Sequence, residues 1–267
     1  MRAARGWTVA SWAIVAVLLV PFVPLVLTSV ASGYFHPQVV PERFSTRAWA
    51  IVLEPGGASW RALVDSVVIA LAVTGASLVL AVPAGRVLAT HRFRGRSAIQ
   101  VALLAPVLVP AIAVAIGLHV VFIRLGLDGG IPGVVLVHLL PTVPYVLLLT
   151  IGVFANADLE LEAQARSLGA GFWQTQWHVT RRLVAPGLAV AALFGFLISW
   201  GQYALTLVIG GGRVVTLPIL LFASASGGDV AVTAATALFH GLPALGVLVI
   251  AARVLGARGA TSLGGAR

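Results

Sequence analysis

The chain has 267 residues, of which 60% are hydrophobic and only 9% are charged, whereas soluble domains usually contain about 25% charged residues. Eight acidic and seventeen basic residues cannot supply the polar surface that a water-soluble globule of this length needs. The composition therefore excludes a soluble globular protein and predicts one that lies largely in lipid.

Two residue types that often carry chemistry are absent. The chain has no cysteine, and all seventeen basic residues are arginine. Without lysine there is no P-loop lysine and no Schiff base, and without cysteine there is no disulfide or thiolate nucleophile. If ATP drives this protein, another chain must bind the nucleotide.

The formal net charge is +9, which raises the question of a nucleic-acid partner. The arginines, however, are scattered through apolar sequence and form no basic stripe, and no nucleic-acid recognition motif accompanies them. We therefore expect no nucleic-acid partner, and membrane topology explains the charge better.

The chain contains six apolar stretches that are long enough to cross the hydrocarbon layer, for which a helix needs about 20 residues. These stretches predict an all-α, polytopic integral membrane protein with six transmembrane helices. Their approximate ranges are 7–30, 63–89, 99–123, 131–154, 188–209 and 236–255.

The first apolar stretch could also be a secretory signal, because Arg2 and Arg5 precede it and Ser29-Val30-Ala31 resembles a cleavage site. It is longer than a usual signal core, and Pro21 and Pro24 interrupt it. We expect an uncleaved first transmembrane helix.

Arginines in the connecting segments predict the orientation, because basic residues collect on the cytoplasmic side of a membrane. If the N-terminus is cytoplasmic, twelve of the seventeen arginines and three of the eight acidic residues lie on the cytoplasmic side. That side then carries all of the net charge, while five arginines and five acids balance outside. We therefore expect both termini to be cytoplasmic.

Prolines recur inside the predicted spans, at positions 21, 24, 83, 106, 110, 141 and 144. Each removes a backbone donor, and in lipid the freed carbonyls need other partners. Either the helices are simply kinked where they pack, or the bundle bends around a path.

The segment 155–186, between the fourth and fifth spans, predicts two short helices. Asp158 or Asn156 can cap a helix over 159–166 that carries acids in its first turn, and Gly169 can end it. Residues 172–179 can form a second helix before Pro186 marks entry into the next span.

The second short helix presents aromatic side chains in a loop that should face the cytoplasm. Trp173 and Trp177 are one turn apart, and Phe172 is adjacent. Such anchors fit a groove on a partner protein. The alternative places the tryptophans at the lipid headgroups; the acids and the glycine break favour docking.

The segment 160–186 resembles the cytoplasmic loop of bacterial binding-protein-dependent ABC importer permeases, whose pattern is Glu-Ala-Ala, three residues, then Gly, and later Leu-Pro. Here Arg166-Ser167-Leu168 and Gly169-Ala170 fit that pattern. The Glu-Ala-Ala position reads Ala163-Gln164-Ala165, with Glu162 displaced by one residue, and Arg181-Arg182 replaces Leu-Pro.

Several motifs outside this loop are also similar to that family and extend the resemblance over about 63–255. It is nearest to the polyamine, iron, thiamine and sulfate branch. The motifs are Arg92-Phe93-Arg94-Gly95-Arg96, Pro106 to Pro110, Gly117-Leu118, His138 with Pro144-Tyr145, Ser199-Trp200-Gly201-Gln202-Tyr203, Gly210-Gly211-Gly212 and Thr216-Leu217-Pro218.

The resemblance implies a type I ABC importer: two permeases, identical or different, a cytoplasmic ATPase dimer that binds ATP and Mg, and an external solute-binding protein. This chain would be a bacterial inner-membrane permease for a small solute such as a polyamine, iron, thiamine or an inorganic anion, without enzymatic activity of its own. The predicted ATPase-coupling residues are Glu160, Glu162, Ala163, Ala165, Gly169, Ala170, Phe172, Trp173 and Trp177.

The chain is accordingly divided into three parts. Residues 1–62 form the first span and an external loop, 63–255 form the permease core with five spans and the coupling loop 155–186, and 256–267 form a cytoplasmic tail.

Polar residues within the fifth span suggest a translocation path, because such groups usually face a bundle interior. Ser199, Gln202 and Thr206 share one face of a continuous helix, and Tyr203 is adjacent. The alternative role for these side chains is hydrogen bonding between helices.

A turn after the fifth span is expected to serve as an external loop or gate. Gly210, Gly211 and Gly212 can turn tightly, after which 214–225 can form a short amphipathic or re-entrant segment that includes Pro218. The resemblance favours a contact with the solute-binding protein here.

Three histidines, His119, His138 and His240, lie toward the outer ends of their predicted spans, and three imidazoles could bind a metal. With no pair spaced by one turn and no carboxylate expected nearby, we expect no metal site. An intramembrane protease that uses Ser199 and His240 is a remote alternative, because no elbow or oxyanion motif accompanies the serine. A secondary carrier or channel without an ATPase is the closer alternative.

Overall fold

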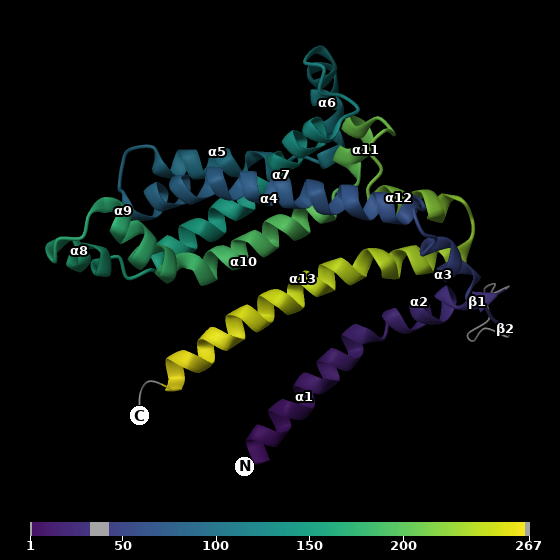
Figure 1. The fold of residues 1–267 in the computed structure, drawn as a ribbon, viewed down its shortest axis with the longest axis horizontal. Coiled ribbons are helices and arrows are strands. Elements are labelled where there is room, and N and C mark those ends of the chain that lie inside the picture. Colours follow the sequence, from purple (N-terminus) through teal and green to yellow (C-terminus); the bar gives the residue numbers. More distant parts are fainter. Residues whose placement is uncertain (1, 33–42, 265–267) are drawn as a thin grey trace. The chain divides into compact units, whose positions relative to one another are not determined.

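The computed structural model describes residues 2–32 and 43–264, with side chains placed for 11–32, 43–106 and 108–253. Apart from two-residue strands β1 (Ala31–Ser32) and β2 (Arg43–Phe44), which pair antiparallel, its regular structure is helical, and the predicted helical membrane fold is confirmed (Figure 1). The helices are α1 (Arg2–Leu19), α2 (Phe22–Ser29), α3 (Arg47–Val52), α4 (Ala58–Thr90), α5 (Arg96–Leu108), α6 (Ala111–Arg124), α7 (Ile131–Ala155), α8 (Glu160–Ser167), α9 (Phe172–Thr175), the π-helical turn η1 (Gln176–Thr180), α10 (Arg181–Trp200), α11 (Ala204–Gly210), α12 (Leu217–Ser226) and α13 (Val230–Gly264).

Within the described residues, five helical stretches are long and apolar enough to cross a membrane. The bent pair α5 and α6 forms a sixth if it is counted as one span. This agrees with the six predicted spans. The five stretches are Ser11–Ser29, Ala58–Thr90, Ile131–Ala155, Phe172–Trp200 and Val230–Arg253.

The prediction of one continuous third span was wrong, because α5 and α6 meet at an angle of 88°. Val109 is extended, with φ −94° and ψ 132°, and Pro110 is the N-cap residue that precedes the next helix. A residue before proline disfavours the helical conformation, and proline cannot donate to the preceding turn. The chain therefore leaves the helix at Val109 and restarts after Pro110.

The fifth predicted span also differs from the structure at both ends. The helix breaks after Trp200 and resumes at Ala204, so 188–209 is not one helix. The separate short helix predicted for 172–179 is instead the start of a continuous stretch, Phe172–Trp200, in which η1 joins α9 to α10.

The chain forms two compact units, and the first comprises 1–63 and 217–243. Within it, Arg47 on α3 forms an ion pair with Asp229, just before α13. The ring of Trp60 meets that of Phe239 edge to face at 5.5 Å between centroids. These contacts join the α3–α4 region to the beginning of α13.

The second unit comprises 64–216 and 244–267. Its centre depends on close approach between α7 and the helices α4 and α10, since a Cβ on Gly85 would lie 2.7 Å from Thr150 Cγ2 and one on Gly187 would lie 2.4 Å from Val153 Cγ2. Small residues permit such contacts between membrane helices. In this unit α8 and α9 lie at one end, and α6 and α11 lie at the other (Figure 1).

Candidate functional site

The loop after α7 contains the predicted helix and the predicted glycine break. The backbone N–H of Glu160 donates to Asp158 Oδ1 at 3.2 Å, whereas the Asn156 amide donates to the Gly152 carbonyl instead. Gly169 has φ +91°, a conformation that favours glycine. This geometry ends α8 at the predicted position.

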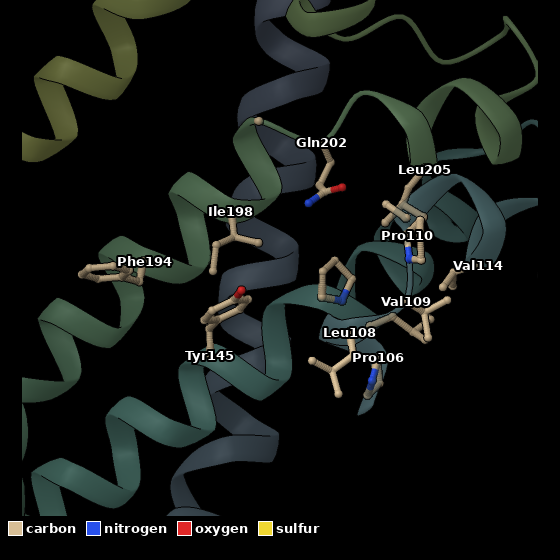
Figure 2. A pocket seen from close by; sticks show the side chains of 14 residues that line it. Pro106, Leu108, Val109, Pro110, Val114, Tyr145, Phe194, Ile198, Gln202 and Leu205 are labelled. Carbon is tan, nitrogen blue, oxygen red and sulfur yellow. The ribbon is translucent and has the colours of Figure 1, made fainter. Parts of the chain in front are cut away.

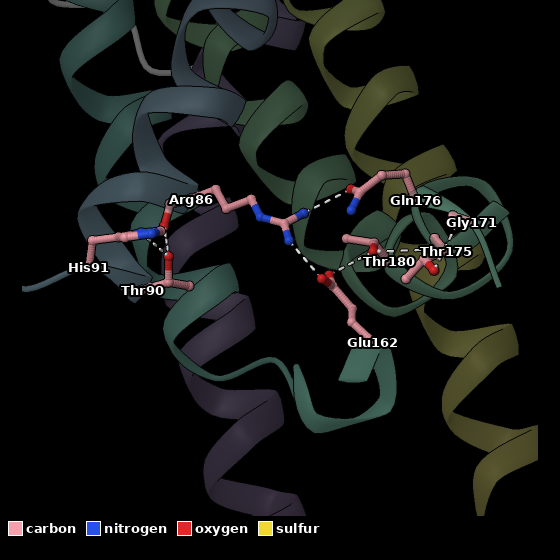
Figure 3. A network of polar contacts seen from close by, with 8 residues as sticks. All are labelled: Arg86, Thr90, His91, Glu162, Gly171, Thr175, Gln176 and Thr180. Atoms are coloured by element: carbon pink, nitrogen blue, oxygen red, sulfur yellow. Dashed lines mark hydrogen bonds and ion pairs between the residues drawn. The ribbon is translucent and has the colours of Figure 1, made fainter. Parts of the chain in front are cut away.

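A buried polar network holds α8 against α4 and the α9–α10 junction (Figure 3). Arg86 of α4 donates to Glu162 Oε2 at 2.7 Å and to Gln176 Oε1 at 2.8 Å. The Thr180 hydroxyl donates to the other oxygen of Glu162 at 2.6 Å. Every partner lies in the same compact unit, so the network fixes how α8 sits on the bundle.

Glu162 was predicted to contact the ATPase, but only 6% of it is exposed and its side chain faces inward. Its carboxylate binds Arg86 and Thr180 and so holds α8 on the bundle, and it is not available to a partner protein. Sequence analysis did not identify Arg86, Gln176 or Thr180 as part of this site. An arginine inside an apolar helix normally needs a partner, and Arg86 was the residue by which the network could have been found.

Exposed apolar side chains gather in sequence around the glycine break, and we call Leu168, Phe172, Trp173 and Trp177 the α8–α9 surface. Their exposed fractions are 88%, 57%, 80% and 63%. The rings of Phe172 and Trp173 meet edge to face at 5.3 Å. Sequence analysis missed Leu168, the most exposed of the four.

The other predicted coupling residues surround the α8–α9 surface. Glu160, Ala163 and Gly169 are exposed, and Ala165 and Ala170 are half-buried. The Arg181 guanidinium lies 4.3 Å from the Trp177 ring centroid. The charged and aromatic side chains of the α8–α9 surface thus face outward, while Glu162 faces inward and holds α8 on the bundle.

A cavity of about 730 Å³ lies where the two broken helices meet α7 (Figure 2). The α5–α6 break and the α10–α11 break both contribute to its wall. Only Tyr145 and Gln202 bring polar side-chain atoms to it, and none of its lining residues is charged. The lining residues are Pro106, Leu108, Val109, Pro110, Ala111, Val114, Leu140, Pro141, Tyr145, Phe194, Ile198, Gly201, Gln202 and Leu205.

The predicted path residues divide between this cavity and the bundle interior. Gln202 lines the cavity, whereas Ser199 and Thr206 are buried and hydrogen-bond to His138 of α7. The prediction that the three share one helix face was wrong, because the helix breaks between them. Tyr203 is half-buried at the start of α11.

The glycine run at the opposite end of this unit makes the predicted turn. Gly211 and Gly212 have φ of +54° and +75°. The Gly129 N–H donates to the Ile209 carbonyl at 2.8 Å, which joins the α6–α7 loop to the end of α11. Pro218 is a buried residue in the first turn of α12, and its role as part of an external gate stays a prediction.

One of the three histidines, His119, has a carboxylate neighbour that was not predicted. His119 Nε2 lies 2.9 Å from Asp128 Oδ1, so the expectation of no nearby carboxylate was wrong for this residue. His240 is half-buried on α13. Across the described ranges 2–32 and 43–264, no group of three or more His, Asp or Glu side chains could hold a metal ion.

Comparison with known proteins identifies the relatives of this architecture. Residues 81–258 match the model of the family described as binding-protein-dependent transport system inner membrane component. The molybdenum transport system permease protein ModB of Mycobacterium tuberculosis is 32% identical over 222 residues, covering 78% of this chain and 83% of ModB. The diacetylchitobiose uptake system permease protein DasC of Streptomyces coelicolor is 26% identical over 189 residues, covering 70% and 68% of the two chains.

The fold is shared with a solved structure. A crystal structure of a bacterial ABC transporter involved in the import of the acidic polysaccharide alginate contains a chain that superposes with a TM-score of 0.70. The sequence identity is 19%, and the match covers 95% of this chain and 98% of the other.

Proposed function

The chain belongs to the family of inner membrane components of binding-protein-dependent transport systems, and we propose that it is coupled to a separate ATPase through the α8–α9 surface. Movement of the ATPase dimer would then reach α4 through the Glu162–Arg86 ion pair and α10 through the continuous stretch Phe172–Trp200. ATP and Mg would be bound by the ATPase and not by this chain.

The observation that carries this proposal is an exposed apolar surface whose helix is held to the bundle by the Arg86–Glu162–Thr180 network. Leu168 and Trp173 are 88% and 80% exposed although both are large and apolar, and large exposed apolar side chains grouped in this way mark interaction sites. The hydrogen bonds of Glu162 with Arg86 and Thr180 hold α8 in place before any partner binds, which reduces the entropy lost when the partner docks.

The cavity at the two helix breaks is the part of the path that this chain would contribute. Unwound backbone at membrane depth is tolerated where it lines a cavity, and solute sites form at interrupted helices in many transporters. Because no charged side chain lines the cavity, we expect the external solute-binding protein to make the selection among charged solutes.

The proposed assembly follows from these two ends. A second permease, identical or different, would complete the path, the α8–α9 end would face the cytoplasm of a bacterium, and the end with Gly210 to Gly212 would face the binding protein. The candidate solutes remain a polyamine, iron, thiamine or an inorganic anion. The related systems named above take up molybdenum and diacetylchitobiose.

Co-purification with the ATPase tests the coupling surface. Trp173→Ala should reduce the recovered ATPase at least tenfold, since an aromatic anchor at an interface contributes about 2 kcal/mol or more. Trp12→Ala is the matched control, because Trp12 is 73% exposed on α1 and lies far along the chain from the loop. Equal losses in both variants, or no loss in either, would contradict the proposal.

Uptake by proteoliposomes separates an importer from a carrier or channel. Complexes reconstituted with the ATPase and the solute-binding protein should accumulate solute only when ATP is present on the side of the membrane that carries the ATPase. Uptake by this chain without either partner would support a carrier or channel instead.

A further inference from the structure

A buried histidine connects the two halves of the broken fifth span. His138 of α7 is 1% exposed. Its Nδ1 lies 3.0 Å from Ser199 Oγ, at the end of α10, and its Nε2 lies 2.9 Å from Thr206 Oγ1, in α11. One imidazole ring therefore bonds to both sides of the break.

The donors and acceptors of this network can be assigned. The Thr206 hydroxyl donates its hydrogen to the Gln202 carbonyl at 2.9 Å, so its oxygen must accept from His138 Nε2–H. A neutral imidazole then has an acceptor at Nδ1, and the Ser199 hydroxyl donates to it. In its neutral form His138 is thus the Nε2–H tautomer, and both of its ring nitrogens are satisfied.

The network lies where the backbone most needs it. A helix break in a membrane frees carbonyls that must find partners, and the Thr206 hydroxyl satisfies the carbonyl of Gln202 itself. Gln202, between the two bonded residues, brings one of the two polar side chains to the cavity wall. Its position therefore depends on how the two half-helices are held.

We propose that His138 is a positioning residue that clamps α10 to α11 and so fixes Gln202 on the wall of the solute path. The clamp uses a ring with one donor and one acceptor pointing in opposite directions, which few side chains reproduce. As a statement about transport, the inference rests on the proposed function of the cavity. As a statement about geometry, it stands on the hydrogen bonds alone.

The conservative variants can separate the two halves of the clamp. Asparagine places a polar atom near the position of Nδ1 and can keep the Ser199 bond, whereas glutamine places one near Nε2 and can keep the Thr206 bond. His138→Asn and His138→Gln should each lose the link across the break. Thr206→Val removes the acceptor with little change of shape, and Thr206→Ser, which keeps a hydroxyl, is its matched control.

Cysteine labelling reads the geometry directly, because the chain has no cysteine of its own. Gln202→Cys reports the cavity wall at the break, and Tyr145→Cys reports the same cavity from the uninterrupted helix α7. In purified full-length protein, Thr206→Val and the His138 variants should change the maleimide labelling rate at position 202 about tenfold, equivalent to about 1.4 kcal/mol. The rate at position 145, and both rates in Thr206→Ser, should change less than about twofold, or about 0.4 kcal/mol.

Equal changes at positions 202 and 145 would overturn the clamp, because they would indicate a general loosening of the bundle. No change at either position would overturn it as well. Should His138→Asn or His138→Gln fail to fold, the Thr206→Val and Thr206→Ser pair still decides the result.

Transport gives the second reading. In the complete transporter, Thr206→Val should lower ATP-dependent uptake about tenfold, while Thr206→Ser stays near the parent and the ATPase is recovered equally from both. Unchanged uptake despite altered labelling would refute the role in transport and leave the clamp standing. If the parent complex shows no ATP-dependent uptake, the proposed function fails, and the labelling result still tests the clamp.

Discussion

Replacing Arg86 with methionine removes the positive charge behind α8 while keeping a long apolar side chain. Glu162 would keep only the hydrogen bond from Thr180 and would remain buried without its cation. Removing one partner of a buried ion pair costs about 3–5 kcal/mol. Because 29% of the Arg86 side chain and 8% of the Glu162 side chain are exposed, water reduces this cost, and we expect about 2–3 kcal/mol for Arg86→Met.

This cost falls on the docking of one short helix and not on the whole bundle. Local opening of α8 should therefore become about 30- to 150-fold more frequent, at about 1.4 kcal/mol for each factor of ten. Hydrogen exchange of the α8 amides measures that opening, and amides in the centre of α7 serve as the internal reference.

Two comparison variants make the reasoning refutable. Glu160→Gln changes an exposed carboxylate on the same helix and should leave exchange unchanged. Arg86→Met combined with Glu162→Leu removes both charges, and it should restore part of the protection because an apolar pair costs less than a single buried charge. If the double variant is less protected than Arg86→Met alone, the ion pair is not what holds α8.

Three further predictions follow from contacts elsewhere in the chain. Gly187→Ala should lower the melting temperature in detergent, by the equivalent of about 1–3 kcal/mol, because the added Cβ would overlap a valine of α7. Gly169→Ala should destabilise the end of α8 by about 1–2 kcal/mol, because φ of +91° is costly for alanine, and proteolysis near the break should accelerate. The hydrogen bond from Arg47 lowers the pKa of Asp229, and the hydrogen bond from the Val232 N–H lowers it further. The ion pair should therefore stabilise the fold at pH values above the usual aspartate pKa, and this stabilisation should be lost as the pH falls through the lowered pKa. The stabilisation should be less than about 1 kcal/mol, because both side chains are exposed.

Matched controls accompany these three predictions. Gly152→Ala adds a methyl group where nothing lies within 4 Å of the Cβ and should not lower the melting temperature. Gly171 has φ −67°, so Gly171→Ala should not accelerate proteolysis. Asp229→Asn should melt below the parent at neutral pH and converge with it in acid; a constant difference at every pH would contradict the role of the carboxylate.

The order of the membrane helices was predictable from the sequence, and so were the approximate limits of all but the third and fifth spans. Apolar length alone identifies a membrane helix, because a run of about 20 apolar residues has no other stable solvent. The glycine break at Gly169 and the turn at Gly211 and Gly212 were predictable for a local reason, since positive φ favours glycine. The aromatic loop residues were also visible, because Trp173 and Trp177 are one turn apart in a short segment outside the predicted spans.

Which side chains meet was decided only in three dimensions. Periodicity assigned Ser199, Gln202 and Thr206 to one face of a continuous helix, but the helix breaks after Trp200 and resumes at Ala204. In the structure Ser199 and Thr206 hydrogen-bond to His138, and Gln202 lines the cavity. Likewise, the sequence predicted that Glu162 contacts a partner protein. Its side chain is buried because it pairs with Arg86, which lies 76 residues earlier in the chain.

The sequence by itself determined that this chain lies largely in lipid, that several of its segments are long and apolar enough to cross a membrane, and where glycines let its backbone turn. These properties depend on solvent transfer and on local dihedral preference, which act on each segment separately. The tertiary structure alone decided that the α5–α6 and α10–α11 breaks line one cavity and which buried polar groups pair. Those outcomes depend on partners far apart in the chain, because a polar group buried in lipid must be satisfied wherever the fold brings a partner within reach.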